Sequence, residues 1–205
     1  MSGTEKNAAA ARYWLSTKEM AGCALFAVLT GVGANVRIPL PYVPLTLQTV
    51  LVLMSGLLLG GRRAAVAMTM YMLMGLLGLP VFAGGGGFHS LLSPSFGFVV
   101  GFIPAAWVTG RICQALKVNG NSLRETAARS LACLLGVFAY DLVGCAWLYF
   151  NLNVIVGKSF TVSQTIASGL APFLLTDAIK LVVAVIISGV ISVRLQKSHP
   201  RLFSD

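Results

Sequence analysis

Charged residues are scarce in this sequence: Asp, Glu, Lys and Arg together make up 10% of its 205 residues, whereas hydrophobic residues make up 57%. Ordinary globular domains contain about 25% charged residues. A soluble domain with so little charge could not cover its own surface, so we expect lipid to surround the apolar excess. Because a spanning helix needs about 20 mostly apolar residues, the length leaves room for about five to seven spans in a single domain.

The sequence also lacks the patterns of several common functional classes. Its four cysteines form no C-x-x-C pair, so neither a disulfide framework nor a metal site is predicted. Gly157, Lys158 and Ser159 resemble the end of a Walker A motif, but Leu152 stands where the first glycine of that motif belongs. The net charge of +9 comes from basic residues at the ends of apolar runs, without interleaved aromatic residues, which disfavours nucleic acid as a partner.

Six apolar runs divide the chain, and each is interpreted as a transmembrane helix. We therefore expect an all-α membrane protein, a six-transmembrane-helix bundle with structured external loops. Its membrane domain is predicted to cover residues 19–195, between an N-terminal tail at 1–18 and a C-terminal tail at 196–205. The runs cover approximately residues 20–36, 45–60, 64–79, 96–112, 130–150 and 169–193.

Basic residues are distributed unevenly over the segments that flank these runs. Two of them, Arg37 and Lys158, lie in connections of odd number, whereas twelve lie in the tails and in the second and fourth connections. Since Lys and Arg are retained on the cytoplasmic side of a membrane, both termini are predicted to be cytoplasmic, which agrees with six spans. The twelve are Lys6, Arg12, Lys18, Arg62, Arg63, Arg111, Lys117, Arg124, Arg129, Arg194, Lys197 and Arg201.

Two segments on the predicted outer side are rich in residues that interrupt helices. Residues 37–44 contain three prolines, each of which lacks an N–H donor and favours extended geometry in the residue before it. Residues 81–89 contain the glycine run 84–87 and end at His89, which we interpret as a solvated or loop-bonded histidine. Irregular backbone beside a membrane has to be buried in protein or line a cavity, so both segments are expected to be structured.

Three ionisable residues lie inside apolar runs: Asp141, Asp177 and Lys180. A charge at membrane depth costs about 2.5–3.5 kcal/mol on insertion scales, so such residues face the bundle interior and usually pair. Asp177 and Lys180 are three positions apart and share a helix face, which permits either a structural ion pair or a site for a polar solute. Their position near the outer end of the last run favours the solute site. For Asp141, a helix-packing hydrogen bond and a ligand contact are both open.

Small residues recur every four positions in the first run, at Cys23, Ala27 and Gly31. Such a stripe allows two helices to approach closely in a membrane. Two interpretations are open: contact with a helix of a partner protein, and packing within this chain.

Several strings of the sequence are more specific than its composition. Residues 38–49 closely resemble the first-loop signature of the BioY family, the biotin-binding S components of energy-coupling-factor (ECF) transporters. Their sequence is Ile38-Pro39-Leu40-Pro41-Tyr42-Val43-Pro44-Leu45-Thr46-Leu47-Gln48-Thr49. The same family is resembled by the strings 56–60, 78–85, 140–148 and 172–180. The resemblance implies a six-helix bundle that holds its substrate near the external face, under the first and third loops. It also implies a separate energising module of a transmembrane coupling protein and two ATPases.

The resemblance also assigns roles to individual residues. Asp177 and Lys180 resemble the polar core of the biotin pocket, with Gln48 and Tyr140 as nearby contacts and Asp141 as a further candidate. The third loop, with Gly84 and Gly85, is similar to the segment that closes over biotin. The chain departs from some relatives at two places: the third loop has glycine where they have asparagine, and residues 95–97 read Ser-Phe-Gly where others have Thr-Gly-Gly.

The expected function is therefore biotin binding and uptake in a bacterial plasma membrane, with lipid around the bundle and no catalysis, cofactor or metal of its own. Alternatives are an S component for another small vitamin and a stand-alone carrier that couples to protons. An intramembrane enzyme would need a nucleophile–base pair or several metal-binding carboxylates at membrane depth. Asp141 and Asp177 are the two carboxylates inside the runs, and they fall on different helices.

Overall fold

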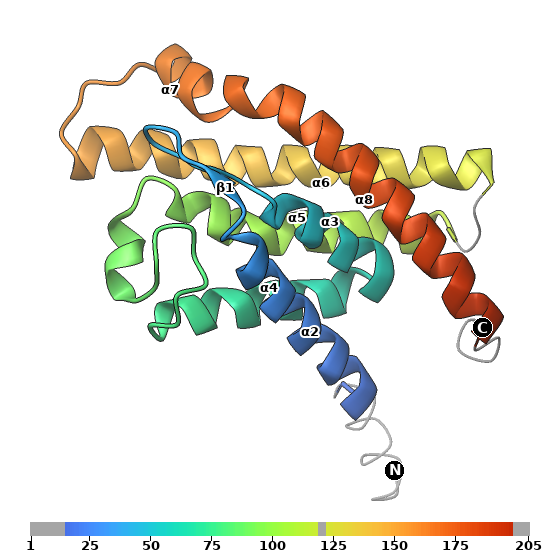
Figure 1. The fold of residues 1–205 in the computed structure, drawn as a ribbon. Coiled ribbons are helices and arrows are strands. Elements are labelled where there is room, and N and C mark those ends of the chain that lie inside the picture. The colour runs from blue at the N-terminus through green and yellow to red at the C-terminus, as the bar shows by residue number, and fades with distance from the viewer. Residues whose placement is uncertain (1–14, 119–121, 199–205) are drawn as a thin grey trace, which may run out of the picture.

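The computed structural model describes residues 15–118 and 122–198, and most of them belong to helices (Figure 1). The six principal helices are α2 (Thr17–Gly33), α3 (Gln48–Leu59), α4 (Gly61–Leu76), α5 (Phe96–Ala115), α6 (Leu123–Phe150) and α8 (Ala171–Ser198). Smaller elements are the strands β1 (Arg37–Ile38) and β2 (Leu45–Thr46), a 3₁₀ helix (Phe88–Leu92), a π-helical turn (Asn151–Ile155) and α7 (Val162–Gly169).

The expected helices are all present, but their lengths differ. Three helical stretches of the described chain are long and apolar enough to cross a membrane: Phe96–Ala115, Leu123–Ile155 and Val162–Arg194. Helices α2, α3 and α4 are shorter, with 17, 12 and 16 residues. The tails predicted at 1–18 and 196–205 fall largely outside the described residues.

Capping residues explain where two of the helices begin. The Ser16 hydroxyl accepts a hydrogen bond from the backbone N–H of Glu19, and the Glu19 carboxylate accepts one from the backbone N–H of Ser16. Ser122 and Glu125 form the same reciprocal arrangement. A capping box satisfies N–H groups that have no partner within the helix. Helix α6 therefore begins at Leu123, well before the apolar run predicted to start at residue 130.

The connections between helices lie at two opposite ends of the bundle (Figure 1). The start of α2, the α3–α4 turn, the α5–α6 connection and the end of α8 lie at one end. The first loop, the third loop and the connection that leads into α7 lie at the other end. This arrangement matches the alternation of connections between the two sides that the basic residues predicted. The proline-rich first loop and the glycine-rich third loop lie together at the predicted outer end.

The first loop, expected to be extended, forms a short β-hairpin. Strands β1 and β2 pair antiparallel, with Arg37 opposite Thr46 and Ile38 opposite Leu45. The tip of the hairpin reaches the α6–α7 connection, where the Tyr42 ring meets the Phe160 ring at 5.5 Å and the Lys158 ammonium lies 5.4 Å from the Tyr42 ring centroid. Proline-rich backbone is thus compatible with pairing because the prolines lie between the two strands.

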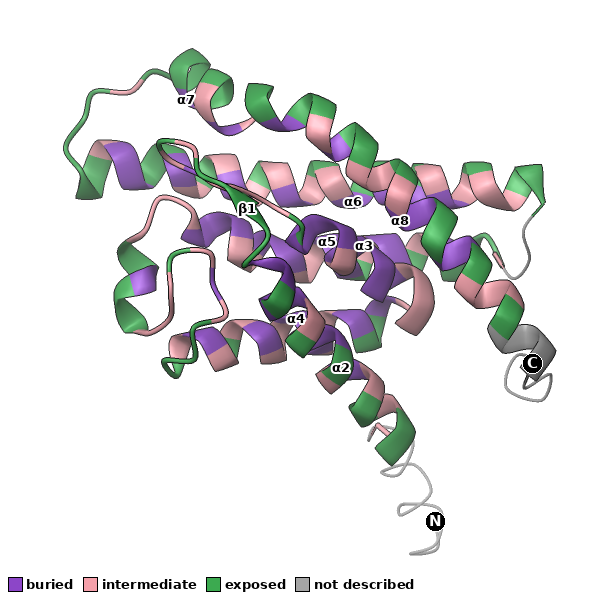
Figure 2. Cartoon of the chain, viewed as in Figure 1, coloured by how far each residue is buried: buried purple, intermediate pink, exposed green. Residues whose placement is uncertain are grey.

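Glycines allow α5 and α6 to approach each other closely. A Cβ atom at Gly101 would lie 2.9 Å from the carbonyl oxygen of Tyr140, and one at Gly136 would lie 2.1 Å from the hydroxyl of Thr109. Small residues at such contacts are typical of membrane bundles, where close packing rather than exclusion of water holds helices together. The buried residues gather along this inner seam, whereas large apolar residues such as Phe138 and Leu142 are exposed on the outside (Figure 2).

The small-residue stripe on α2 packs within the chain. Cys23 and Ala27 are fully buried, and the Cys23 thiol donates a hydrogen bond of 3.3 Å to the Arg63 carbonyl on α4. A Cβ atom at Gly31 would lie 3.0 Å from Val81. Of the two interpretations of Cys23, Ala27 and Gly31, the structure therefore favours packing within this chain, because α4 and the third loop cover that face, and contact with a partner helix stays a prediction.

The α5–α6 seam gives a stability prediction. We expect Gly136→Val to lower the free energy of unfolding by about 1–3 kcal/mol, because the added side chain overpacks against Thr109 and Ala105. Ala146→Val, at an exposed position of the same helix, is the control and should leave stability nearly unchanged. Thermal unfolding of the detergent-purified variants measures both. Equal midpoints for the two variants would contradict the close approach.

Candidate ligand-binding site

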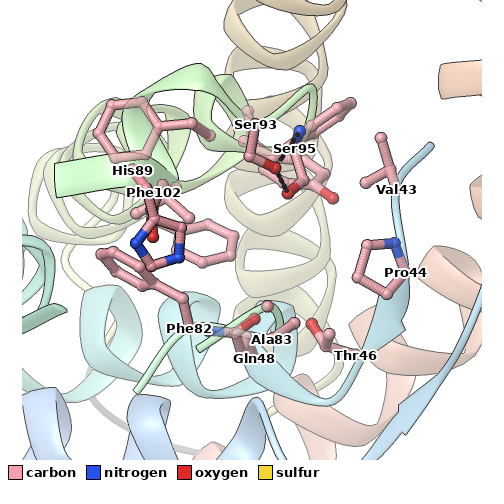
Figure 3. Close-up of a pocket in the computed structure, with 16 residues that line it drawn as sticks. Val43, Pro44, Thr46, Gln48, Phe82, Ala83, His89, Ser93, Ser95 and Phe102 are labelled. Atoms are coloured by element: carbon pink, nitrogen blue, oxygen red, sulfur yellow. Dashed lines mark hydrogen bonds between the residues drawn. The ribbon is translucent and has the colours of Figure 1, made fainter. Parts of the chain in front are cut away.

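A cavity of about 240 Å³ lies at the end of the bundle that carries the first and third loops (Figure 3). Segments far apart in the sequence enclose it: the first hairpin, the start of α3, the third loop, the 3₁₀ helix with the residues after it, α5 and α6. Its lining consists of Val43, Pro44, Thr46, Gln48, Phe82, Ala83, Gly84, His89, Ser90, Ser93, Ser95, Phe96, Phe98, Val99, Phe102 and Tyr140.

Aromatic rings form one wall of the cavity. The Tyr140 ring stacks on Phe102 at 5.6 Å and contacts Phe98 at 5.2 Å, and Phe82 meets Phe96 edge-on at 6.3 Å. Centroid separations of 4.5–7 Å are typical of favourable aromatic contacts, so the rings support one another in fixed orientations. A wall of this kind suits an apolar ring system.

Gln48 holds a fixed position at the cavity wall. Its side-chain amide donates a hydrogen bond to the Tyr71 hydroxyl, which in turn donates to the Val81 carbonyl at 3.2 Å. Gln48 and Tyr71 are both buried. This chain of hydrogen bonds connects α3, α4 and the third loop, so the amide is oriented before any ligand arrives.

The third loop folds as a tight turn over the cavity. Phe82 and Gly85 exchange two backbone hydrogen bonds, of 2.9 and 3.0 Å, and Gly85 has a φ of +111°, which favours glycine. Gly87 donates to the Gly75 carbonyl at 2.7 Å, which ties the loop to α4. Gly84 lines the cavity, whereas Gly85 shapes the turn without lining it.

Asp177 and Lys180 form an ion pair of 2.9 Å on α8, with side chains that are 6% and 12% exposed. Neither residue lines the cavity. The pair lies directly behind the aromatic wall: Lys180 is 5.9 Å from the Phe173 ring centroid, and Phe173 stacks on Phe98 at 6.0 Å. Among the residues that the structure describes, Oδ2 of Asp177 is buried without a hydrogen-bond partner.

Asp141 does not line the cavity either. It is close enough to interact electrostatically with Asp177 and Lys180, and within the described part of the chain its Oδ1 atom is buried without a hydrogen-bond partner. The sequence-predicted residues are thus divided into two groups. Gln48, Tyr140 and Gly84 meet at the cavity, whereas the three charged residues gather behind it, and ligand contact by any of them stays a prediction.

Sequence reasoning missed two parts of the site. The phenylalanines of the wall were not singled out, and neither were the serines Ser90, Ser93 and Ser95. His89, interpreted as a solvated or loop-bonded histidine, also lines the cavity. The tryptophan N–H of Trp147 donates to the Ser93 carbonyl at 3.0 Å, and the Asn151 amide donates to the Leu92 carbonyl at 2.9 Å. A cluster of serines around Pro94, just before an apolar run, was the signal in the sequence.

The third loop gives a prediction that compares two neighbouring glycines. A Cβ atom at Gly86 would lie 2.0 Å from the Leu79 carbonyl oxygen, whereas one at Gly84 would meet nothing within 4 Å. We expect Gly86→Ala to speed amide hydrogen exchange over residues 82–87, because the backbone has to move to admit the methyl group. Gly84→Ala is the control and should exchange as wild type; equal protection in both variants would contradict the described turn.

The comparisons with known proteins agree on one family. The sequence profile of the BioY family matches residues 5–197. A probable biotin transporter BioY of Lysinibacillus sphaericus is 37% identical over 162 residues, covering 79% of this chain and 80% of that protein. A biotin transporter BioY of Thermotoga maritima is 35% identical over 181 residues, covering 88% of this chain and 96% of that protein.

A solved structure resembles the whole fold. It is the S component for biotin from an ECF-type ABC transporter, and it superposes with a TM-score of 0.74 at 27% identity, covering 96% of this chain and 95% of that chain. The predicted six-helix membrane bundle is thereby confirmed. Profile, relatives and structure together show that this chain belongs to the BioY family.

Proposed function

We propose that this chain is a biotin-binding protein, the substrate-specificity component of an ECF-type biotin transporter in a bacterial plasma membrane. The observation that carries the proposal is the cavity under the first and third loops, in a chain whose relatives are named biotin transporters. Those names describe transport and not catalysis, so we infer binding and uptake without covalent chemistry.

The chemistry of biotin suits the cavity. Biotin combines an apolar ring system and a thioether with a polar ureido group and a carboxylate at the end of an aliphatic chain. The rings of Phe82, Phe98 and Phe102 offer an apolar surface for the ring system. Small-molecule sites are mostly apolar, with a few placed polar groups that fix orientation. Gln48 and Tyr140 are such groups here.

We infer that the ureido group points toward Tyr140 and the ion pair behind it. The buried Oδ2 atom of Asp177 has an unused capacity to accept a hydrogen bond, and ureido N–H groups are donors. Lys180 supplies donors for the ureido carbonyl. Hydrogen bonds to charged groups in a dry environment are stronger than those between neutral groups. Their binding free energy would offset the cost of a small shift of the Tyr140 and Phe98 rings on binding.

Transport requires partners that this chain does not supply. The sequence has no complete Walker A motif, and Leu152 stands at the position of its first glycine. We therefore infer that uptake depends on a transmembrane coupling protein and a pair of ATPases. The solved structure with the same fold is described as a component of such a transporter.

The first test is binding of biotin by the purified protein, followed by uptake. We expect isothermal calorimetry in detergent to show saturable binding of biotin and no binding of other small vitamins such as thiamine or riboflavin. Uptake of labelled biotin by cells should rise when a coupling protein and ATPases are co-expressed. Binding of a different vitamin would contradict the proposed substrate, and equal uptake in a host without any such module would favour a stand-alone carrier.

The second test concerns the ion pair. Asp177→Asn and Lys180→Ala should each weaken biotin binding at least about tenfold, because a charge-assisted hydrogen bond is lost. Ile179→Ala, at an exposed position between them, is the control and should bind as wild type. Calorimetry measures affinity and thermal unfolding measures stability. Wild-type affinity in the double variant, with lowered stability, would assign the pair a structural role only.

A further inference from the structure

A second hollow lies between α2 and α4, at the end of the bundle where both helices begin (Figure 1). This is the predicted cytoplasmic end, opposite the ligand cavity. We call the hollow the α2–α4 groove; it is lined by residues between Leu15 and Ala24 and between Arg62 and Met70. Its volume is about 620 Å³, compared with about 240 Å³ for the ligand cavity, so it has room for a molecule of substantial size.

The walls of the groove are apolar. Ala21 and Ala24 line it from α2, and Val66 and Met70 line it from α4. The short alanine side chains leave space beside longer neighbours such as Met20, which is 57% exposed. Because the hydrocarbon region of a bilayer contains no water, an apolar hollow on a surface that faces the membrane is filled by a lipid chain or by another protein.

The length of the groove distinguishes between these two occupants. The ten residues from Leu15 to Ala24 correspond to about 15 Å along a helix. The hydrocarbon core of a bilayer is about 30 Å thick, so the groove extends over about one leaflet. A transmembrane helix of a partner would follow α2 through the whole core, whereas a phospholipid occupies one leaflet. The groove therefore suits a lipid chain better than a helix.

Positive charge surrounds the cytoplasmic rim of the groove. Lys18, Arg62 and Arg63 lie there with one acidic residue, Glu19, so the four side chains carry a net charge of +2 (three basic minus one acidic). Glu19 forms an ion pair with Arg63. Arg62 lines the groove and is exposed. It also interacts within the protein, and the five N–H donors of a guanidinium allow a phosphate contact in addition.

We propose that the α2–α4 groove binds an anionic phospholipid of the cytoplasmic leaflet, with an acyl chain along Ala21, Val66 and Met70 and the phosphate against Arg62. A guanidinium matches a phosphate in geometry, because it donates two parallel hydrogen bonds. Basic pockets between transmembrane helices on the cytoplasmic side are typical sites for anionic headgroups. Both helices begin at this end, so the positive ends of their dipoles also favour a negative headgroup.

Native mass spectrometry of the detergent-purified protein tests the groove by titration with phosphatidylglycerol or with phosphatidylcholine of the same acyl chains. We expect the wild type to bind phosphatidylglycerol at least about fivefold more tightly, which is the attraction expected from one basic residue near a membrane surface. Arg62→Gln should remove this preference, because it removes the charge at the rim. Ala21→Phe should weaken binding of both lipids, because the ring takes the place of the acyl chain.

Matched variants elsewhere in the chain serve as controls. Arg124→Gln removes an exposed basic residue at the same end of the bundle, and Ala146→Phe adds a ring at an exposed position of α6. Both should bind the two lipids as the wild type does. Thermal unfolding without added lipid checks that each variant is folded.

Three results would overturn the proposal. Equal binding of the two lipids by the wild type would exclude selection of an anionic headgroup. Wild-type lipid binding in both Arg62→Gln and Ala21→Phe would place the lipid elsewhere on the protein. A second copy of the chain bound in place of lipid, and lost in Ala21→Phe, would assign the groove to a helix instead.

Discussion

Every backbone N–H and C=O group that lies in lipid must find its partner within the chain, and this constraint governs the whole structure. It confines the middle of the molecule to helices and restricts irregular backbone to the ends. In this chain the proline-rich and glycine-rich irregular backbone lies at one end. There the first hairpin and the third loop satisfy their backbone polar groups through β-pairing and tight turns. The cavity exists at that end because loops, unlike helices, can cover it.

The same constraint explains why the interior is so rich in glycine and aromatic residues. Without water to drive helices together, α5 and α6 depend on close contact, and Gly101 and Gly136 provide it. Rings such as Phe98 and Phe102, which stack against Tyr140, fill the space between the two helices beside the cavity.

The sequence predicted the helices and the clustering of the special loops, because prolines, glycines and basic residues limit where a chain can cross lipid. It predicted the start of α6 poorly, since the capping box at Ser122 extends the helix into polar sequence. The aromatic wall was not predictable from periodicity, because the lipid-facing and the protein-facing sides of a span are both apolar. For the same reason the stripe at Cys23 could not reveal which helix it would contact.

The candidate site was predictable only in part. Gln48, Tyr140 and Gly84 stood out because they belong to strings that resemble a known family, and they do meet at the cavity. Asp177 and Lys180 stood out because charge is costly in a membrane, but the same cost makes them pair with each other. Distance along the sequence gives no information on whether a ring stands between such a pair and the cavity.

The first hairpin differs from the rest of the wall in what holds it, since its tip contacts the α6–α7 connection through the Tyr42 and Phe160 rings. Its strands pair through two residue positions each, Arg37 with Thr46 and Ile38 with Leu45. The opposite rim is fixed to α6 by Trp147 and Asn151 and to α4 by Gly87. The two rims of the cavity are therefore held by different kinds of interaction: β-pairing and the contact between the Tyr42 and Phe160 rings on one side, and hydrogen bonds to two helices on the other.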